Sequence, residues 1–202
     1  MKKNNDITDK SKIINEWQWI YANYPKFDII SDVKSPSIYI STIGHKFDHL
    51  KRSNFKDKYN EILEKESYSI CLIDDSLIIY YYIFDNSDKI VGHNLVYIPS
   101  PDVENSHFEE EVAISKYLRA DYDRTGYKKI IHTLVHLHIG IYNNNFRIPI
   151  AHYLSPYDFL YIVLKYVYHN DQDVVDKLIC KKQKECLLSS DEISKLRIIF
   201  GE

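Results

Sequence analysis

The sequence predicts an α+β fold with an antiparallel β-sheet of about six strands, helices near the N-terminus and a helical C-terminal third. Two segments of residues 1–66 show helical spacing of apolar residues, and residues 67–150 contain short runs rich in Ile, Tyr and Val between turn residues. A capped helix start then opens residues 151–202. With 202 residues, 45% of them apolar, the chain is long enough to bury a core, and we expect residues 1–202 to form a single domain.

The N-terminal helices are predicted from apolar periodicity and from residues that start or stop a helix. Over Ser11–Tyr24 apolar residues recur at helical spacing, the serine can act as the N-cap, and Pro25 stops the helix just beyond. Asn54–Glu66 predicts a second, charged helix. Between the two helices, Ile38–Thr42 is a short run with β propensity.

Strands are predicted wherever β-branched and aromatic residues alternate with turn signals. The first three strands are separated by short Asp-containing turns, so we expect them to be antiparallel neighbours. The acidic segment 102–111 is expected to loop over the surface. The predicted strands are Tyr68–Ile73, Leu77–Phe84, Ile90–Ile98, Ile114–Tyr122, Thr133–Tyr142 and Phe146–Ile150.

The clearest helix start lies near residue 155. Ser155 can cap the helix, Pro156 suits its first position, and Asp158 stands three residues after the cap, which predicts a helix to about His169. Two further helices are predicted over residues 171–186 and 193–200.

Composition excludes several classes of protein. The net charge of -3 and pI of about 6.3 provide no global positive field that would recruit nucleic acid. Three cysteines, Cys71, Cys180 and Cys186, form no paired motif, which favours a reducing compartment. The polar N-terminus does not resemble a signal peptide, and no apolar stretch reaches the roughly 20 residues that span a bilayer. We therefore expect a cytoplasmic protein without membrane association.

One polar strand face is the candidate functional site. Side chains alternate along a strand, so Arg119 and Asp121 share one face of their strand, and His136 and His138 share one face of the next. Arg147 lies on the charged side of the following strand. If the three strands are neighbours, these five side chains converge on one surface.

Such a cluster is compatible with metal-free phosphodiester cleavage. One imidazole would accept a proton and the other would donate one, which makes His136 and His138 the acid–base pair. Arg119 and Arg147 would bind the phosphate, and Asp121 would orient an imidazole.

Three other interpretations remain open. Asp121, His136 and His138 could bind a divalent metal ion, with His132 or His152 completing the coordination. The arginines could instead clamp a phosphate or carboxylate without catalysis. Finally, the charged residues could form only a cross-strand salt-bridge network on a solvated face of the sheet.

Four segments of the second half of the chain resemble a bacterial family of unknown function, DUF2290. They are Tyr117–Tyr122, His132–Gly140, Phe146–Pro149 and Leu154–Phe159. The resemblance implies a bacterial, cytoplasmic protein and transfers no activity. The Arg-x-Asp and His-Leu-His elements are also similar, more loosely, to small ribonuclease-like toxins of toxin–antitoxin modules. That similarity implies a nucleic-acid substrate and a role against phage or other mobile elements.

The leading hypothesis is therefore a small nuclease that acts on RNA or DNA, RNA being preferred. The competing hypothesis is a non-catalytic partner or regulatory subunit of a bacterial defence complex. Such a subunit would bind a protein encoded nearby, through the acidic loop or the C-terminal helices, and would use the polar face only for structure.

Overall fold

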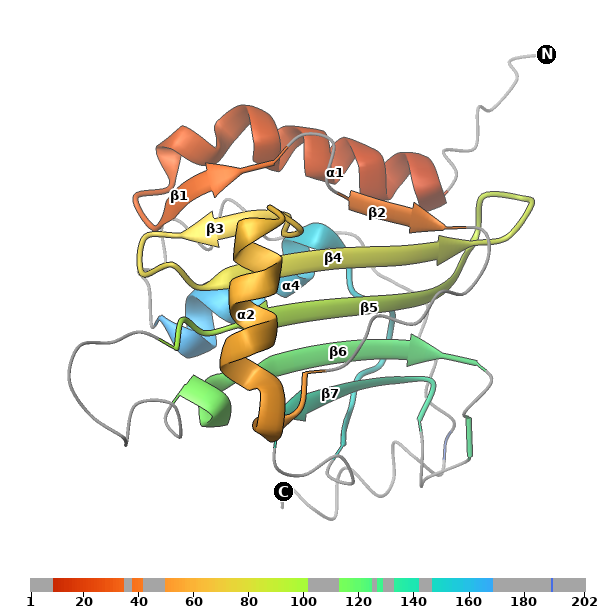
Figure 1. Ribbon diagram of the computed structural model, residues 1–202. Helices are drawn as coiled ribbons and strands as arrows, with labels where there is room; N and C mark the ends of the chain where they lie inside the picture. Colours follow the sequence, from red (N-terminus) through yellow and green to blue (C-terminus); the bar gives the residue numbers. More distant parts are fainter. Residues whose placement is uncertain are drawn as a thin grey trace.

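The computed structural model is built around one mixed β-sheet with helices on both faces (Figure 1). It describes residues 9–34, 38–41, 50–101, 113–124, 127–128, 133–141, 147–168 and 190. The strands are β1 (Ile30–Val33), β2 (Ile38–Ser41), β3 (Ile70–Leu72), β4 (Leu77–Phe84), β5 (Ile90–Ile98), β6 (Leu118–Asp123), β7 (Val135–Ile139) and β8 (Ile148–Pro149). The helices are α1 (Asp9–Asn23), α2 (Phe55–Glu64) and α4 (Pro156–Ile162), which continues into a π-helical turn, η3 (Val163–Val167). Short 3-10 turns, η1 (Tyr24–Lys26) and η2 (Arg52–Asn54), follow α1 and precede α2.

The α+β prediction is confirmed, with more strands than the sequence predicted. The strand order is β1-β3-β4-β5-β6-β7-β8, and every neighbouring pair in this path is antiparallel. β2 lies beside β4 and is parallel to it. β1 is not among the predicted strands, because Ser31 and Asp32 interrupt its apolar run. Its pairing with β3 also contains an irregularity between Ile30 and Asp32.

The predicted strand over Ile114–Tyr122 is wrong in its first part. Residues 113–116 form a helical turn, and β6 begins only at Leu118. The amide of Tyr117 donates to the carbonyl of Ile114 at 3.4 Å, so the two buried side chains point into the same apolar cluster from one helical turn. Burial of residues spaced three apart favoured the helix over the strand.

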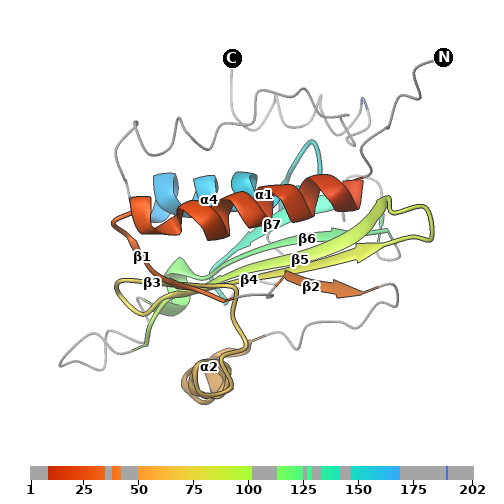
Figure 2. The ribbon, with the colours of Figure 1, turned by 90° about the horizontal axis from the view of Figure 1, so that it is seen from above.

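The two faces of the sheet are covered by different helices (Figure 2). α1 and α4 pack on one face, in a core that includes Trp17, Tyr80 and Phe159. α2 packs on the opposite face, where Phe55 and Tyr59 bury against Ile79 and other strand residues. Each large apolar side chain that is fully buried stabilises the fold by roughly 1.5–3 kcal/mol.

The start of α4 agrees with the prediction and is anchored to the sheet. Ser155 Oγ accepts from the amide of Asp158, and the Asp158 carboxylate accepts from the amide of Ser155. From β4, the hydroxyls of Tyr80 and Tyr82 donate to the carbonyls of Pro156 and Leu154, both at 3.1 Å. Both tyrosines are fully buried core residues.

Some predictions fall on residues that the structure does not describe. They are the acidic loop at 102–111 and the helices at 171–186 and 193–200. Among the described residues, no helix has the length and apolar character needed to cross a membrane.

Candidate functional site

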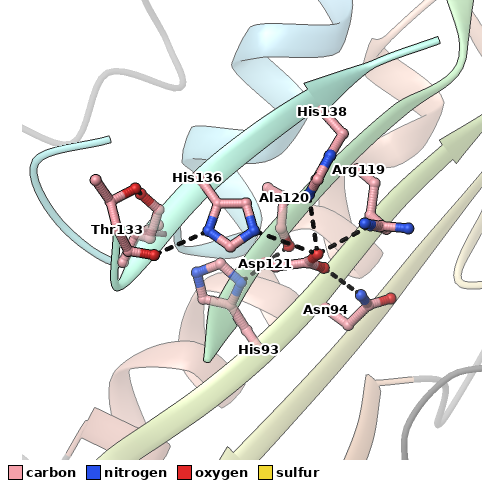
Figure 3. A network of polar contacts seen from close by, with 9 residues as sticks. His93, Asn94, Arg119, Ala120, Asp121, Thr133, His136 and His138 are labelled. Carbon is pink, nitrogen blue, oxygen red and sulfur yellow. Dashed lines mark hydrogen bonds and ion pairs between the residues drawn. The ribbon is translucent and has the colours of Figure 1, made fainter. Parts of the chain in front are cut away.

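Asn94, Arg119, Asp121, His136 and His138 form a cluster on three adjacent strands, here called the polar cluster (Figure 3); Arg119 and the two histidines are buried, and Asn94 and Asp121 are partly exposed. β5, β6 and β7 pair in a register that sets Arg119 opposite His138 and Asp121 opposite both His136 and Asn94. Alternation along each strand then directs all five side chains to the same face of the sheet. The structure therefore brings together four of the five residues that the sequence singled out, and it adds Asn94.

The polar cluster lies on the face of the sheet that α2 covers. Val96 of β5 belongs to the apolar cluster under α2, and it pairs with Arg119 across the sheet. Two residues before Val96 in β5, Asn94 shares this face and pairs with Tyr81 of β4. The apolar residues Leu118 and Ala120 point to the other face, into the core under α1 and α4.

Gly140 helps to hold the register that places His138. It ends β7 with a φ of +69°, a left-handed conformation that glycine adopts without strain. Its amide donates to the carbonyl of Tyr117 at 2.7 Å, so β7 is tied to the start of β6 immediately beyond the histidine.

Asp121 is the centre of the polar cluster. Its Oδ2 accepts a hydrogen bond from Arg119 Nε at 2.9 Å, and its Oδ1 accepts one from the Asn94 side-chain amide. The same Oδ2 lies 3.4 Å from His138 Nε2 and 3.7 Å from His136 Nε2. One carboxylate oxygen thus faces a guanidinium and two imidazoles.

The two imidazoles differ in how they are held. His136 Nδ1 lies 3.0 Å from the carbonyl oxygen of Thr133, which can only accept, so Nδ1 carries the proton and donates. Its Nε2 therefore faces Asp121. His138 has no hydrogen-bond partner at either ring nitrogen, although both nitrogens are buried. The side chains of His136 and His138 are 1% and 3% exposed. This face of the sheet is therefore not solvated at the histidines, as the interpretation of a solvated salt-bridge network required.

Burial and charge together set the ionisation of the polar cluster. Burial by itself would raise the pKa of Asp121, but the contact with His138 and the charge of Arg119 hold that pKa well below its usual range. Burial lowers the pKa of His138, and Asp121 opposes this shift only in part. The carboxylate is therefore ionised and the His138 imidazole is neutral at pH 7.

Arg147 lies beside the polar cluster. β8 pairs with β7 so that Pro149 is opposite His136 and Ile148 is opposite Leu137, and extending that register by one residue places Arg147 opposite His138. The charge of Arg147 contributes to the lowered pKa of His138. Among the described residues, no carboxylate lies within ion-pair distance of this guanidinium, and its Nε is buried without a hydrogen-bond partner.

Unpartnered polar atoms gather on this one face. Native proteins contain few buried side-chain polar atoms without a hydrogen bond, and each one calls for an explanation such as a catalytic role or a bound water or ion. In the described part of the chain they belong to Tyr81, Asn94, Tyr117, His138 and Arg147, all on or beside the polar cluster. Burial raises the pKa of the Tyr117 hydroxyl, so that group keeps its proton and remains a donor. Most of these atoms are donors facing a region that already carries two arginines.

Two other histidines, His93 and His152, lie on the opposite face of the sheet from the polar cluster. His152 lines an apolar pocket of about 670 Å³ on the opposite face, together with Leu118 and Leu137, so it does not complete a metal site with His136. His132 falls outside the described residues. His93 is buried under α4, where Nδ1 donates to the Ala120 carbonyl and Nε2 accepts from the Leu154 amide.

The sequence contains a signal for Asn94. In β5, Asn94 is a polar residue two positions before Val96 in an otherwise apolar strand. The same alternation that paired Arg119 with Asp121 would have placed it on a defined face, but the neighbour across the sheet depends on register.

The contrast between His93 and His138 supports a prediction about stability. His93→Phe should lower the free energy of unfolding by about 1–3 kcal/mol, because it leaves a buried amide and a buried carbonyl without partners. His138→Phe should change it by less than about 1 kcal/mol, because the buried ring nitrogens make no hydrogen bond and the contact of Nε2 with Asp121 is long, at 3.4 Å. Urea denaturation in buffer with a chelator would measure both. A loss of stability in His138→Phe as large as that in His93→Phe would contradict the description of His138.

Comparison with known proteins identifies the family. Residues 22–199 match the family model of an uncharacterised conserved protein, DUF2290. This range contains all eight strands, α2, α4 and every residue of the polar cluster. No curated protein and no solved structure matches the chain. Since the matched range covers most of its 202 residues, the chain belongs to the DUF2290 family of uncharacterised conserved proteins.

Proposed function

We propose that the polar cluster and Arg147 bind and cleave a phosphodiester, and that the protein is a small nuclease. Arg119 and Arg147 would bind the phosphate, and Asp121, His136 and His138 would form the reacting centre. The looser similarity of Arg-x-Asp and His-Leu-His to ribonuclease-like toxins favours RNA as the substrate, in a role against phage or other mobile elements.

The excess of positive charge at this site carries this proposal. Asp121 offsets Arg119, and Arg147 adds a second positive charge beside this pair, so the charged side chains of the site leave an excess of about +1. Unpartnered buried donors of Tyr117, Arg147 and His138 surround this charge. A phosphate anion would neutralise the charge and accept hydrogen bonds from these donors. Asp121 and Arg147 are less buried than the imidazoles, so the phosphate would approach from their side.

Purified full-length protein incubated with labelled RNA, single-stranded DNA and duplex DNA would test the proposal. Each substrate would be tried with a chelator and with Mg²⁺, Mn²⁺ or Zn²⁺. We expect cleavage of RNA. If no substrate is cleaved under any of these conditions, the nuclease proposal fails and the non-catalytic partner becomes the better interpretation.

Two arginine variants provide a matched comparison. Arg147→Ala should lower kcat/KM by about 100-fold, because it removes a charged donor to the phosphate. Arg124→Ala should leave kcat/KM unchanged. Arg124, like Arg147, directly flanks a strand of the sheet, but its Nε donates to the Tyr122 hydroxyl, on the other face of the sheet. Equal losses in the two variants would indicate a general effect of charge rather than a phosphate site at Arg147.

A further inference from the structure

The spacing of the ligand atoms in the polar cluster fits a metal ion better than a set of direct hydrogen bonds. The separations of 3.4 and 3.7 Å between Asp121 Oδ2 and the two imidazole Nε2 atoms are long for N–H···O bonds, which cluster near 2.9–3.0 Å. Ligands bonded at about 2.0–2.1 Å around a tetrahedral ion lie about 3.3–3.4 Å apart. Potential ligand atoms of Asp121, His136 and His138 all lie within 4.8 Å of one another.

The orientation of His136 also fits metal coordination. A metal-bound imidazole usually donates its other N–H to a backbone carbonyl or a carboxylate, which sets the ring orientation and leaves the remaining nitrogen for the metal. In His136, Nδ1 donates to Thr133 O at 3.0 Å and Nε2 faces Asp121 (Figure 3). His138 brings two buried nitrogens that have no hydrogen-bond partner, so its Nε2 is available as a ligand.

The carboxylate is held in place by groups that would not compete for the ion. Asn94 donates to Oδ1, and Arg119 donates to Oδ2 through one N–H. A carboxylate oxygen has two lone pairs, so Oδ2 can accept from Arg119 and still bind a metal. Two donors on one carboxylate fix its orientation toward the imidazoles.

We propose that Asp121 Oδ2, His136 Nε2 and His138 Nε2 bind one divalent first-row transition-metal ion, such as Zn²⁺, and leave at least one coordination position for water or a phosphate oxygen. Two imidazole ligands favour such an ion over Mg²⁺ or Ca²⁺, which prefer oxygen ligands. The nuclease proposal concerns this same site, and the metal inference deepens it. The imidazole nitrogens are buried, whereas an ion among them could present an open position to a substrate and activate a water.

Metal binding can be tested without a substrate. Full-length protein stripped with a chelator would be titrated with Co²⁺, whose visible absorption reports coordination by protein ligands, and with Zn²⁺ in a calorimeter. We expect one ion per chain, with no comparable binding of Mg²⁺. His138→Phe and Asp121→Asn should each weaken Co²⁺ binding by at least about 100-fold, because each removes a ligand. His152→Ala and His93→Phe remove histidines on the other face and should bind Co²⁺ like the unmodified protein.

Absence of stoichiometric Co²⁺ or Zn²⁺ binding, or unchanged binding in both His138→Phe and Asp121→Asn, would overturn the metal inference. The outcome is separable from that of the nuclease assay. Stoichiometric binding without cleavage of any substrate would leave the metal site standing and reject the nuclease. Cleavage that persists in chelator, by protein that binds no ion, would reject the metal site and leave the nuclease proposal standing.

Discussion

Asp121→Ala is expected to lower the free energy of unfolding by about 3–5 kcal/mol, the cost typical of removing one partner of a buried ion pair. Arg119 is only 8% exposed, and its Nε donates to Asp121 at 2.9 Å. Without the carboxylate, the buried guanidinium keeps its charge and loses its partner, and the Asn94 amide loses its acceptor as well. Urea denaturation of the variant beside the unmodified protein would measure the change.

Asp88→Asn is the matched control for this experiment, because asparagine removes the charge and tolerates the positive φ of 58° at this position. Asp88 also pairs with a cation, Lys10, at 3.2 Å, but the two side chains are 47% and 34% exposed. Solvent screens such a pair, so its loss should cost less than about 1 kcal/mol. The double variant Asp121→Ala, Arg119→Met should recover part of the lost stability, because no unpaired charge remains. A cost below 1 kcal/mol for Asp121→Ala alone would show that Arg119 does not depend on this carboxylate.

His138→Phe is expected to reduce phosphodiester cleavage by about 1,000-fold or more while the protein stays folded. A general acid or base contributes about 10²–10⁴ in rate, and a metal ion contributes several kcal/mol of transition-state stabilisation, so either role of His138 predicts a loss of this size. The phenylalanine ring fills the same buried space without a ligand or a proton-transfer group. Initial rates on the substrate that the unmodified protein cleaves fastest would measure the loss.

His93→Phe should behave in the opposite way. It lowers stability, but at a temperature where the variant remains folded it should cleave at the rate of the unmodified protein, because His93 lies on the opposite face of the sheet. The pair of variants thus separates function from stability. If His93→Phe lost activity and His138→Phe retained it, the polar cluster would not be the reacting centre.

Much of the sheet was predictable because its signals are local. The turns at Asp74–Ser76 and Asp85–Asp88 interrupt apolar runs, and the predicted boundaries of β4 and β5 are those of the structure. The capping box at Ser155 also depends only on residues three positions apart. The helical turn at 113–116 was mistaken for a strand because its identity depends on burial beneath α2, which a local pattern does not contain.

The polar cluster combines both kinds of information. Alternation within one strand is a property of the backbone, so the shared face of Arg119 with Asp121, and of His136 with His138, followed from the sequence. Their meeting across β6 and β7 required the pairing register, and the contribution of Asn94 required the position of β5. The sequence also did not predict that His93 would be fully hydrogen-bonded and that His138 would make no hydrogen bond, because both are histidines in apolar strands.

The amino-acid sequence by itself determined the α+β class, the central strands, the start of α4 and the side of each strand that carries charge. Only the tertiary structure decided that β6 lies between β5 and β7, that the charged side is buried, and that one carboxylate oxygen lies between two imidazoles and a guanidinium. The reason is the range of the interactions involved. Helix caps, turns and strand alternation act over a few residues, whereas register and burial are set by packing among segments far apart in the chain.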